Sequence, residues 1–219
     1  MSRYTADAWR SLRKNPWFII SAAILLVMLA MAIFPQLFTS EDPRACFLER
    51  NRQTPSAEHW FGTDIQGCDY YTRVIYGARN SIAVGFIVSL GVLIISLILG
   101  LVAGYFGKWV DAVISRFTDM VFAVPYILGA LVFLNVIPTR GVREVAMVLI
   151  IFTWPTMTRL MRGSVISAAS TEYVTAARAL GAGHVTIMRR HILPNSLGPV
   201  IGYATVFIGI IIGAEASLI

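Results

Sequence analysis

The chain alternates between long apolar blocks and shorter polar segments, and this alternation predicts its architecture. Apolar residues fill most positions of 17–38, 81–103, 113–137, 145–158 and the stretch from 197 onward. A helix of about 20 mainly apolar residues is long enough to cross the hydrocarbon layer of a bilayer. The sequence therefore predicts an all-α, polytopic transmembrane helical bundle with five spans.

Composition agrees with the pattern and excludes other classes of protein. Hydrophobic residues make up 57% of the 219 positions and charged residues 14%, whereas a soluble domain has about 25% charged residues. The net charge of +6 does not indicate nucleic-acid binding, because the basic residues lie between apolar blocks. The first block is too long for the core of a signal peptide, which has about 7–15 apolar residues.

Lys and Arg are more frequent on one side of the predicted spans, and the positive-inside rule makes that side cytoplasmic. This divides the chain into a cytoplasmic N-terminal segment 1–16, a first transmembrane helix 17–38, an extracytoplasmic loop 39–79 and a transmembrane core 80–219. The core contains a polar cytoplasmic segment, 159–195. The chain is still apolar at its last residues, so we expect a sixth helix to follow.

Both cysteines of the chain, Cys46 and Cys68, fall in the predicted extracytoplasmic loop. Disulfides persist on the oxidising side of a membrane, so the two thiols suggest a bond that closes a loop of about 23 residues and stabilises it by about 3 kcal/mol. Two independent free thiols are the alternative.

Residues 171–195 predict two short helices joined by a tight turn. Ser170 and Thr171 are good N-cap residues. Gly181 and Gly183 are expected to end the first helix, because glycine can adopt the left-handed conformation at a C-cap. A second helical run, 184–192, is expected to stop before Pro194. The first helix has one apolar face at helical spacing, formed by Tyr173, Ala176, Ala177 and Leu180. Small side chains permit close approach of another backbone, so this face is either a docking surface for a cytoplasmic partner or an ordinary contact within the bundle.

The run 175–181, Thr-Ala-Ala-Arg-Ala-Leu-Gly, with Leu193-Pro194 further on, resembles the EAA loop of ABC importer permeases. Thr175 stands where that family usually has Glu, and His191 stands where it has Ile. The segments 59–64 (HWFGTD), 76–81 (YGARNS) and 10–16 (RSLRKNP) resemble dipeptide and oligopeptide permeases, closest to the dipeptide permease C type. The resemblance covers almost the whole chain and implies a type I ABC importer transmembrane domain, which has six helices.

The resemblance implies that the chain is a permease subunit of an ATP-driven importer. It would form half of the translocation pathway for di- or oligopeptides or related small solutes, and couple closure of the ATPases to inward and outward switching. The implied partners are a homologous second permease, two ATPase subunits or a fused pair, an extracytoplasmic solute-binding protein and the lipid bilayer. The implied location is the bacterial inner membrane, with the N-terminus in the cytoplasm.

No catalytic residue is expected, because the sequence shows no Ser–His–Asp or paired-carboxylate constellation. The only Gly-Lys, Gly107-Lys108, is followed by Trp109 and lacks the phosphate-binding pattern. ATP and magnesium would be bound by the partner subunits, and no cofactor by this chain. The three histidines are too scattered along the sequence to predict a metal site. Two groups of site residues follow. The ATPase-coupling residues are Glu172, Tyr173, Thr175, Ala176, Ala177, Leu180, Gly181, Ala182 and Gly183. The binding-protein docking residues are His59, Trp60, Phe61, Gly62, Thr63 and Asp64.

Two acidic residues fall within predicted spans, where ionisable side chains are functional candidates. Asp119 is expected to pair with Arg116 three residues earlier. Glu215 is a candidate for the gate or translocation pathway. An ion-coupled secondary transporter would need more buried acids, and a membrane scaffold with no transport role is a further alternative. Uptake that depends on a co-purifying ATPase would separate the importer from both.

Overall fold

The computed structural model describes residues 9–139 and 141–218, and all regular structure in these ranges is helical. The chain divides into two compact units, Met1–Ile82 and Ala83–Ile219. Four helices are long and apolar enough to cross a membrane, and a fifth span results if one bent helix pair is counted as one. The prediction of an all-α transmembrane bundle is confirmed.

The first unit holds α2 (Pro16–Ile33), two single 3₁₀ turns (Pro35–Leu37 and Leu48–Arg50) and a long connecting loop. Asn15 caps α2 by accepting a hydrogen bond from the Trp17 N–H at 3.0 Å. The helix ends at Ile33 and not at the predicted residue 38. Pro35 explains the difference, because the residue before a proline is disfavoured in helical conformation and Phe34 has φ −125° and ψ 60°.

Helix α3 (Tyr70–Phe106) begins in the first unit and continues into the second. Its 37 residues correspond to about 55 Å, well beyond the apolar thickness of a bilayer of about 30 Å. The helix therefore extends past the apolar block 81–103, and the loop before it ends at residue 69 and not at the predicted residue 79.

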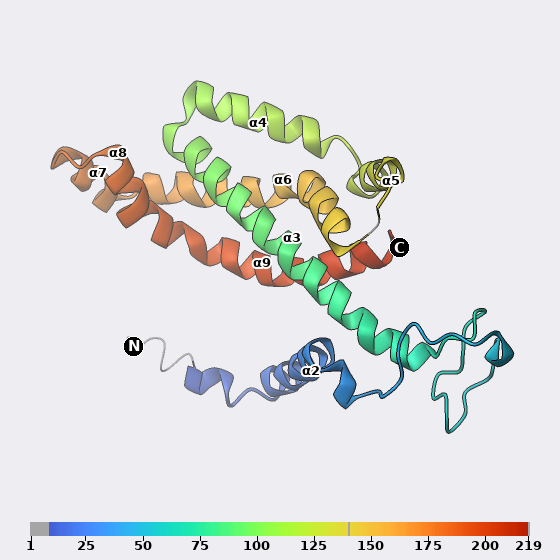
Figure 1. Cartoon of the computed structure of the whole chain (residues 1–219). Coiled ribbons are helices and arrows are strands. Elements are labelled where there is room, and N and C mark those ends of the chain that lie inside the picture. Colours follow the sequence, from blue (N-terminus) through green and yellow to red (C-terminus); the bar gives the residue numbers. More distant parts are fainter. Residues whose placement is uncertain (1–8, 140, 219) are drawn as a thin grey trace. The chain divides into compact units, whose positions relative to one another are not determined.

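In the second unit, α6 (Val142–Ala169) packs against α4 (Lys108–Phe122), α5 (Tyr126–Val136) and α9 (Leu193–Ala216). Figure 1 shows that α4 and α5 run in different directions, and the angle between them is 74°. The predicted third span is therefore broken. The break falls at residues 123–125, where Pro125 starts α5 and lacks the N–H that would continue the hydrogen bonds of α4.

Helix α6 runs past the predicted end of the fourth span at residue 158 and stops only at Ala169. Pro155 lies inside it and is tolerated. The second predicted helical run also continues further than expected. The short helix α8 (His184–Ile187) is followed by one wide π-helical turn, Met188–Ile192, and then directly by α9. Pro194 lies in the first turn of α9. Proline has no N–H to donate to the preceding turn, and the wider π-helical turn does not require an i→i−4 hydrogen bond at this position.

The core of the second unit is made by buried aliphatic side chains of α3, α6 and α9, together with Trp154 and Phe207. Close approach of α3 and α6 depends on two glycines. A Cβ placed on Gly100 would lie 2.7 Å from Met161, and one on Gly104 would lie 2.8 Å from Val165. The second small-residue pair, Gly209 and Gly213, has no such neighbour among the described residues.

Candidate coupling and docking sites

The predicted coupling segment forms α7 (Glu172–Ala179), a turn and α8, at the junction between α6 and α9 (Figure 1). Gly181 has φ +80°. The Ala182 N–H donates to the Ala177 carbonyl and the Gly181 N–H donates to the Arg178 carbonyl, both at 3.0 Å. These two bonds form a Schellman motif, which confirms that Gly181 ends the helix. The same prediction for Gly183 is wrong, because Gly183 has φ −68° and is the N-cap residue of α8.

Thr171 takes the N-cap position of α7, but its hydroxyl does not cap the helix. The hydroxyl instead donates to the Ala168 carbonyl at 2.6 Å, and the Ser170 hydroxyl donates to the Ser167 carbonyl at 2.9 Å. Both hydroxyls thus satisfy carbonyls at the end of α6, which have no partner within their own helix. The connection between α6 and α7 is consequently a tight, hydrogen-bonded turn.

One side of the coupling segment is fixed to the bundle. Val174 of α7 and Ile187 of α8 are fully buried in the core of the second unit. The Tyr105 hydroxyl, at the end of α3, lies 2.8 Å from Nδ1 of His184. The Arg178 guanidinium lies 5.5 Å from the centre of the Tyr105 ring, within the range of a cation–π contact. A displacement of α7 would therefore be transmitted to α3 and α6.

The solvent-facing side of the segment carries apolar side chains among polar ones. Leu180 is 88% exposed, and Tyr173 and Val185 are exposed as well. Of the predicted face, Ala177 is the exception, since it is half-buried and packs against the core. The remaining predicted residues divide in the same way: Ala182 is half-buried, and Glu172, Thr175, Ala176, Gly181 and Gly183 are exposed.

Two ion pairs join α4 to the part of α6 that leads into the coupling segment. Arg162 binds both carboxylate oxygens of Asp111, with Nη2 and Oδ2 2.5 Å apart. Nη2 of Arg159 lies 2.7 Å from Oδ1 of Asp119. The prediction that Asp119 pairs with Arg116 is therefore wrong. Packing of α4 against α6 brings Arg159 within ion-pair distance of Asp119, which the i,i+3 spacing along the chain cannot show.

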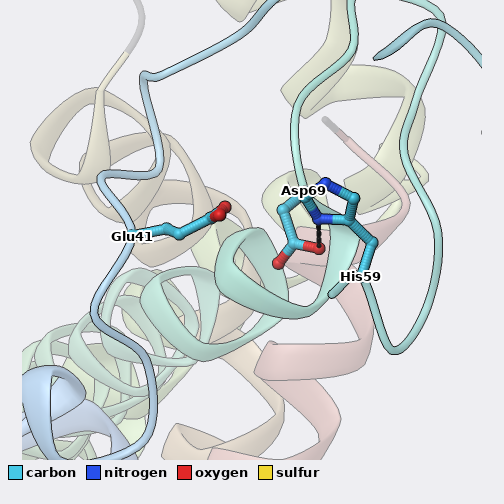
Figure 2. Close-up of side chains that lie close together, drawn as sticks. All are labelled: Glu41, His59 and Asp69. Atoms are coloured by element: carbon cyan, nitrogen blue, oxygen red, sulfur yellow. Dashed lines mark hydrogen bonds and ion pairs between the residues drawn. The ribbon is translucent and has the colours of Figure 1, made fainter. Parts of the chain in front are cut away.

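In the first unit, the loop before α3 is cross-linked by a disulfide between Cys46 and Cys68, whose Cα atoms are 4.2 Å apart. The loop also contains a buried pair of His59 and Asp69, which are joined by a hydrogen bond of 3.1 Å (Figure 2). The other Asp69 oxygen accepts the Thr72 N–H at 2.7 Å. Asp69 thus acts as the N-cap of α3 and positions the histidine at the same time.

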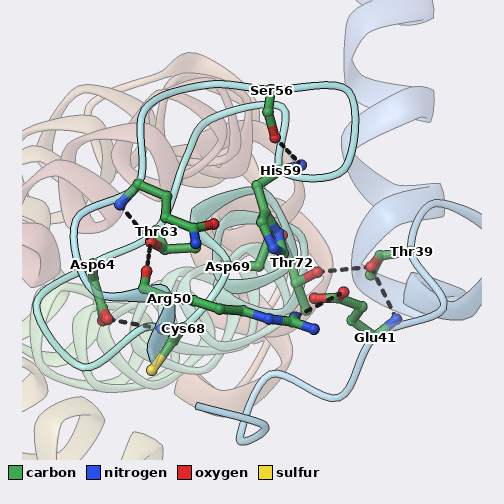
Figure 3. Close-up of polar contacts among 11 residues, drawn as sticks. Thr39, Glu41, Arg50, Ser56, His59, Thr63, Asp64, Cys68, Asp69 and Thr72 are labelled. Atoms are coloured by element: carbon green, nitrogen blue, oxygen red, sulfur yellow. Dashed lines mark hydrogen bonds and ion pairs between the residues drawn. The ribbon is translucent and has the colours of Figure 1, made fainter. Parts of the chain in front are cut away.

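Asp64 organises the second half of this loop (Figure 3). Its Oδ1 accepts the N–H groups of Cys68 and Gln66, at 2.9 and 2.8 Å, and its Oδ2 pairs with Arg73. The backbone N–H of Cys68, together with Gln66 and Arg73, holds the pKa of Asp64 below its ordinary value. Thr63 donates its hydroxyl to the Arg50 carbonyl and accepts the Gln53 N–H.

The predicted docking motif 59–64 therefore separates into two kinds of residue. The side chains of His59, Thr63 and Asp64 are buried and hold the loop together, and Gly62 is buried with them. Trp60 and Phe61 are 63% and 56% exposed and both pack against Tyr71, with ring centres 5.0 and 5.6 Å apart. Only these two aromatic side chains of the motif offer surface to a partner.

Glu215, the predicted gate residue, is 4% exposed near the end of α9. A separate cavity of about 280 Å³ lies at the break between α4 and α5. Its lining is mainly aromatic and aliphatic and includes Pro125, Tyr126, Tyr203, Thr153 and Thr156. Glu215 does not line this cavity.

Comparison with known proteins identifies the family to which the chain belongs. Residues 96–219 match the family model described as "Binding-protein-dependent transport system inner membrane component", and residues 3–55 match "N-terminal TM domain of oligopeptide transport permease C". The chain belongs to this family of ABC importer permeases. These permeases are multi-pass components of the bacterial inner membrane and are not catalytic; no cofactor is expected on this subunit.

Individual permeases match over nearly the whole chain. The dipeptide transport system permease protein DppC of Alkalihalophilus pseudofirmus is 40% identical over 99% of this chain and 72% of its own length. The protein of the same name from Bacillus subtilis is 38% identical, over 98% and 67%. The glutathione transport system permease protein GsiD of Pectobacterium atrosepticum is 33% identical, over 97% and 70%. The permease is thus a DppC-like member of the dipeptide and oligopeptide group, and its family implies ATPase and binding-protein partners.

Proposed function

We propose that this permease forms half of a translocation pathway for di- or oligopeptides, or related small solutes such as glutathione, together with a homologous second permease. A pair of ATPase subunits, separate or fused, would bind ATP and magnesium and seat the coupling segment in a surface groove. An extracytoplasmic solute-binding protein would deliver the substrate. The N-terminus would lie in the cytoplasm.

The main support for this proposal is that the coupling segment has one side buried in the bundle and another side exposed. Its inner side is held by buried Val174 and Ile187, and its outer side presents Tyr173 and Leu180. An exposed apolar patch on a rigidly held element is typical of a protein–protein contact. Closure of an ATPase pair against this patch would move α7, and the contacts of Tyr105 and Arg178 would pass the movement to α3.

On the other side of the membrane, Trp60 and Phe61 would contact the solute-binding protein. The disulfide and the bonds of Asp64 hold this loop in one conformation. A preorganised loop loses less conformational entropy on binding than a mobile one. This supports a docking role for the aromatic pair and a structural role for the buried residues beside it.

The proposal is tested by assembly and uptake together. We expect Ala176→Trp, at an exposed position of α7, to reduce co-purification of the ATPase subunits and to abolish ATP-dependent peptide uptake in proteoliposomes. Ala57→Trp makes the same change at an exposed position of the outer loop and is the matched control for co-purification of the ATPase subunits, which it should leave unchanged. Uptake that follows a proton gradient without any ATPase would contradict the proposal and favour a secondary transporter.

A further inference from the structure

The loop before α3 brings together three potential metal ligands that are far apart in the sequence. The ligand atoms of Glu41, His59 and Asp69 all lie within 4.8 Å of one another. Figure 2 shows the Glu41 carboxylate directed toward the paired side chains of His59 and Asp69. We propose that these three residues bind a divalent transition-metal ion, for which zinc is the probe.

The geometry of the buried pair suits such an ion. Nδ1 of His59 and Oδ1 of Asp69 are 3.1 Å apart. Zinc binds histidine nitrogen and carboxylate oxygen at about 2.0–2.2 Å. For an ion bound to both atoms, the Nδ1–ion–Oδ1 angle would be about 100°, near the tetrahedral value. The ion would take the place of the proton between these two atoms, and the imidazole ring and the carboxylate would turn so that their lone pairs point at it.

Glu41 supplies the third ligand by a change of side-chain rotamer. Its side chain is 42% exposed, so it is free to close the remaining distance, whereas His59 and Asp69 are 3% and 8% exposed and fixed. The half-open side gives the ion an entry path and leaves a fourth position for water. Three protein ligands with one open position is a common zinc arrangement.

Groups behind the ligands hold them in place. Asp69 is oriented by the Thr72 N–H at its second oxygen, and the His59 backbone N–H donates to the Ser56 hydroxyl at 3.1 Å (Figure 3). The bond to the second Asp69 oxygen is of the kind that orients a metal ligand, and the Ser56 bond fixes the backbone that carries His59. The site is therefore preorganised at two of its three ligands.

Electrostatics also favour a cation here. Carboxylate oxygens of Glu41 and Asp69 lie within 4.8 Å of each other, and like charges at this separation repel each other. Arg50 offsets part of this charge from outside, since its guanidinium lies 3.9 Å from the Glu41 carboxylate. A divalent ion between the two carboxylates neutralises them more directly than Arg50 does.

Both cysteines are engaged in the disulfide and are not ligands of this site. The ion would cross-link the segment after α2, the middle of the loop and the start of α3. This adds a second cross-link to the disulfide in the surface proposed to receive a partner. The site does not depend on that proposed function, and its test does not involve transport.

The test uses the full-length permease, purified without a polyhistidine tag, freed of metal by a chelator and kept non-reducing. Zinc is titrated against a fluorescent competing chelator, and X-ray absorption of the bound zinc reports its ligands. We expect one zinc ion per chain with only nitrogen and oxygen ligands. Glu41→Gln and Asp69→Asn each weaken binding by about tenfold or more, since loss of even a group that orients a ligand costs about 10–100-fold.

Two further variants separate this site from general metal adsorption and from misfolding. Arg50→Gln removes the competitor for Glu41, so we expect zinc to bind a few-fold more tightly. Glu49→Gln removes an exposed acid of the same loop and leaves the affinity unchanged. Asp69→Asn retains the cap of α3, and the disulfide content and protease resistance of each variant report its folding. Zinc that is absent from the wild type, or retained by either ligand variant, overturns the proposal.

Discussion

The Tyr105 hydroxyl and Nδ1 of His184 are 2.8 Å apart and join the end of α3 to the start of α8. This bond links the longest helix of the chain to the coupling segment, outside the apolar core. The buried contacts of Val174 and Ile187 fix the segment, and the Tyr105 bond adds a defined orientation. Its loss should affect coupling more than assembly.

We therefore expect Tyr105→Phe to assemble with its ATPase partners but to transport fewer peptides per ATP hydrolysed. A single hydrogen bond contributes about 1 kcal/mol, or about fivefold in an equilibrium. The ratio of uptake to ATP hydrolysis in proteoliposomes measures this. Tyr70→Phe, the same deletion at the other end of α3, is the control. If Tyr105→Phe transports as many peptides per ATP hydrolysed as the wild type, the Tyr105–His184 bond does not contribute to coupling.

The two ion pairs between α4 and α6 should differ in strength. The Asp111–Arg162 pair is partly buried and two-pronged, whereas both members of the Asp119–Arg159 pair are exposed. We expect a double-mutant cycle to give a coupling energy of about 1–3 kcal/mol for the first pair and less than about 1 kcal/mol for the second. Unfolding in mixed detergent measures both, and equal values would contradict the difference in burial.

Replacing both Cys46 and Cys68 with serine should loosen the loop before α3 without unfolding the second unit. The sequence separation is 22 residues, and closure of a loop of this length stabilises by about 3 kcal/mol. Limited proteolysis should then cut the loop of the double variant well before that of the wild type. Equal protection would mean that Asp64 and the other hydrogen bonds suffice to hold the loop.

The structure of this loop should depend on pH through Asp64. The pKa of Asp64 is lowered in the folded loop, so the charged carboxylate stabilises the fold above the unfolded pKa of about 4. That stabilisation is constant at neutral pH and is lost as the pH falls through the lower, folded pKa. Acid titration of protease resistance measures the loss, and in Asp64→Asn this acid-dependent component should be absent.

The sequence predicted those features that depend on nearby residues. Gly181 ends α7 because a C-terminal glycine accepts positive φ, and the apolar blocks identify the spans by their length. The predictions failed where a proline or a distant partner decides the outcome. Pro35 shortens α2 and Pro125 breaks the third span. At Pro194 the helix continues, because a π-helical turn precedes the proline, and no local sequence pattern predicts that turn.

The candidate sites show the same division. Helical spacing placed Tyr173, Ala176 and Leu180 on one face, but it could not show that Ala177 packs inward on the core. The spacing of the histidines does not predict a metal site, because the two residues that would bind an ion together with His59 are carboxylates from other segments. The i,i+3 spacing along the sequence predicts Arg116 as the partner of Asp119, and only the packing of α4 on α6 reveals Arg159 in that role.

The most direct test of the account is a cross-link from the exposed tip of the coupling segment. Among the described residues there is no free cysteine, so Leu180→Cys introduces a single reactive thiol at a position that is 88% exposed. In the assembled importer, a short bifunctional reagent should join this thiol to an ATPase subunit, with a yield that changes when ATP is bound. A thiol that reacts with reagent in solution but never joins an ATPase subunit would contradict the account.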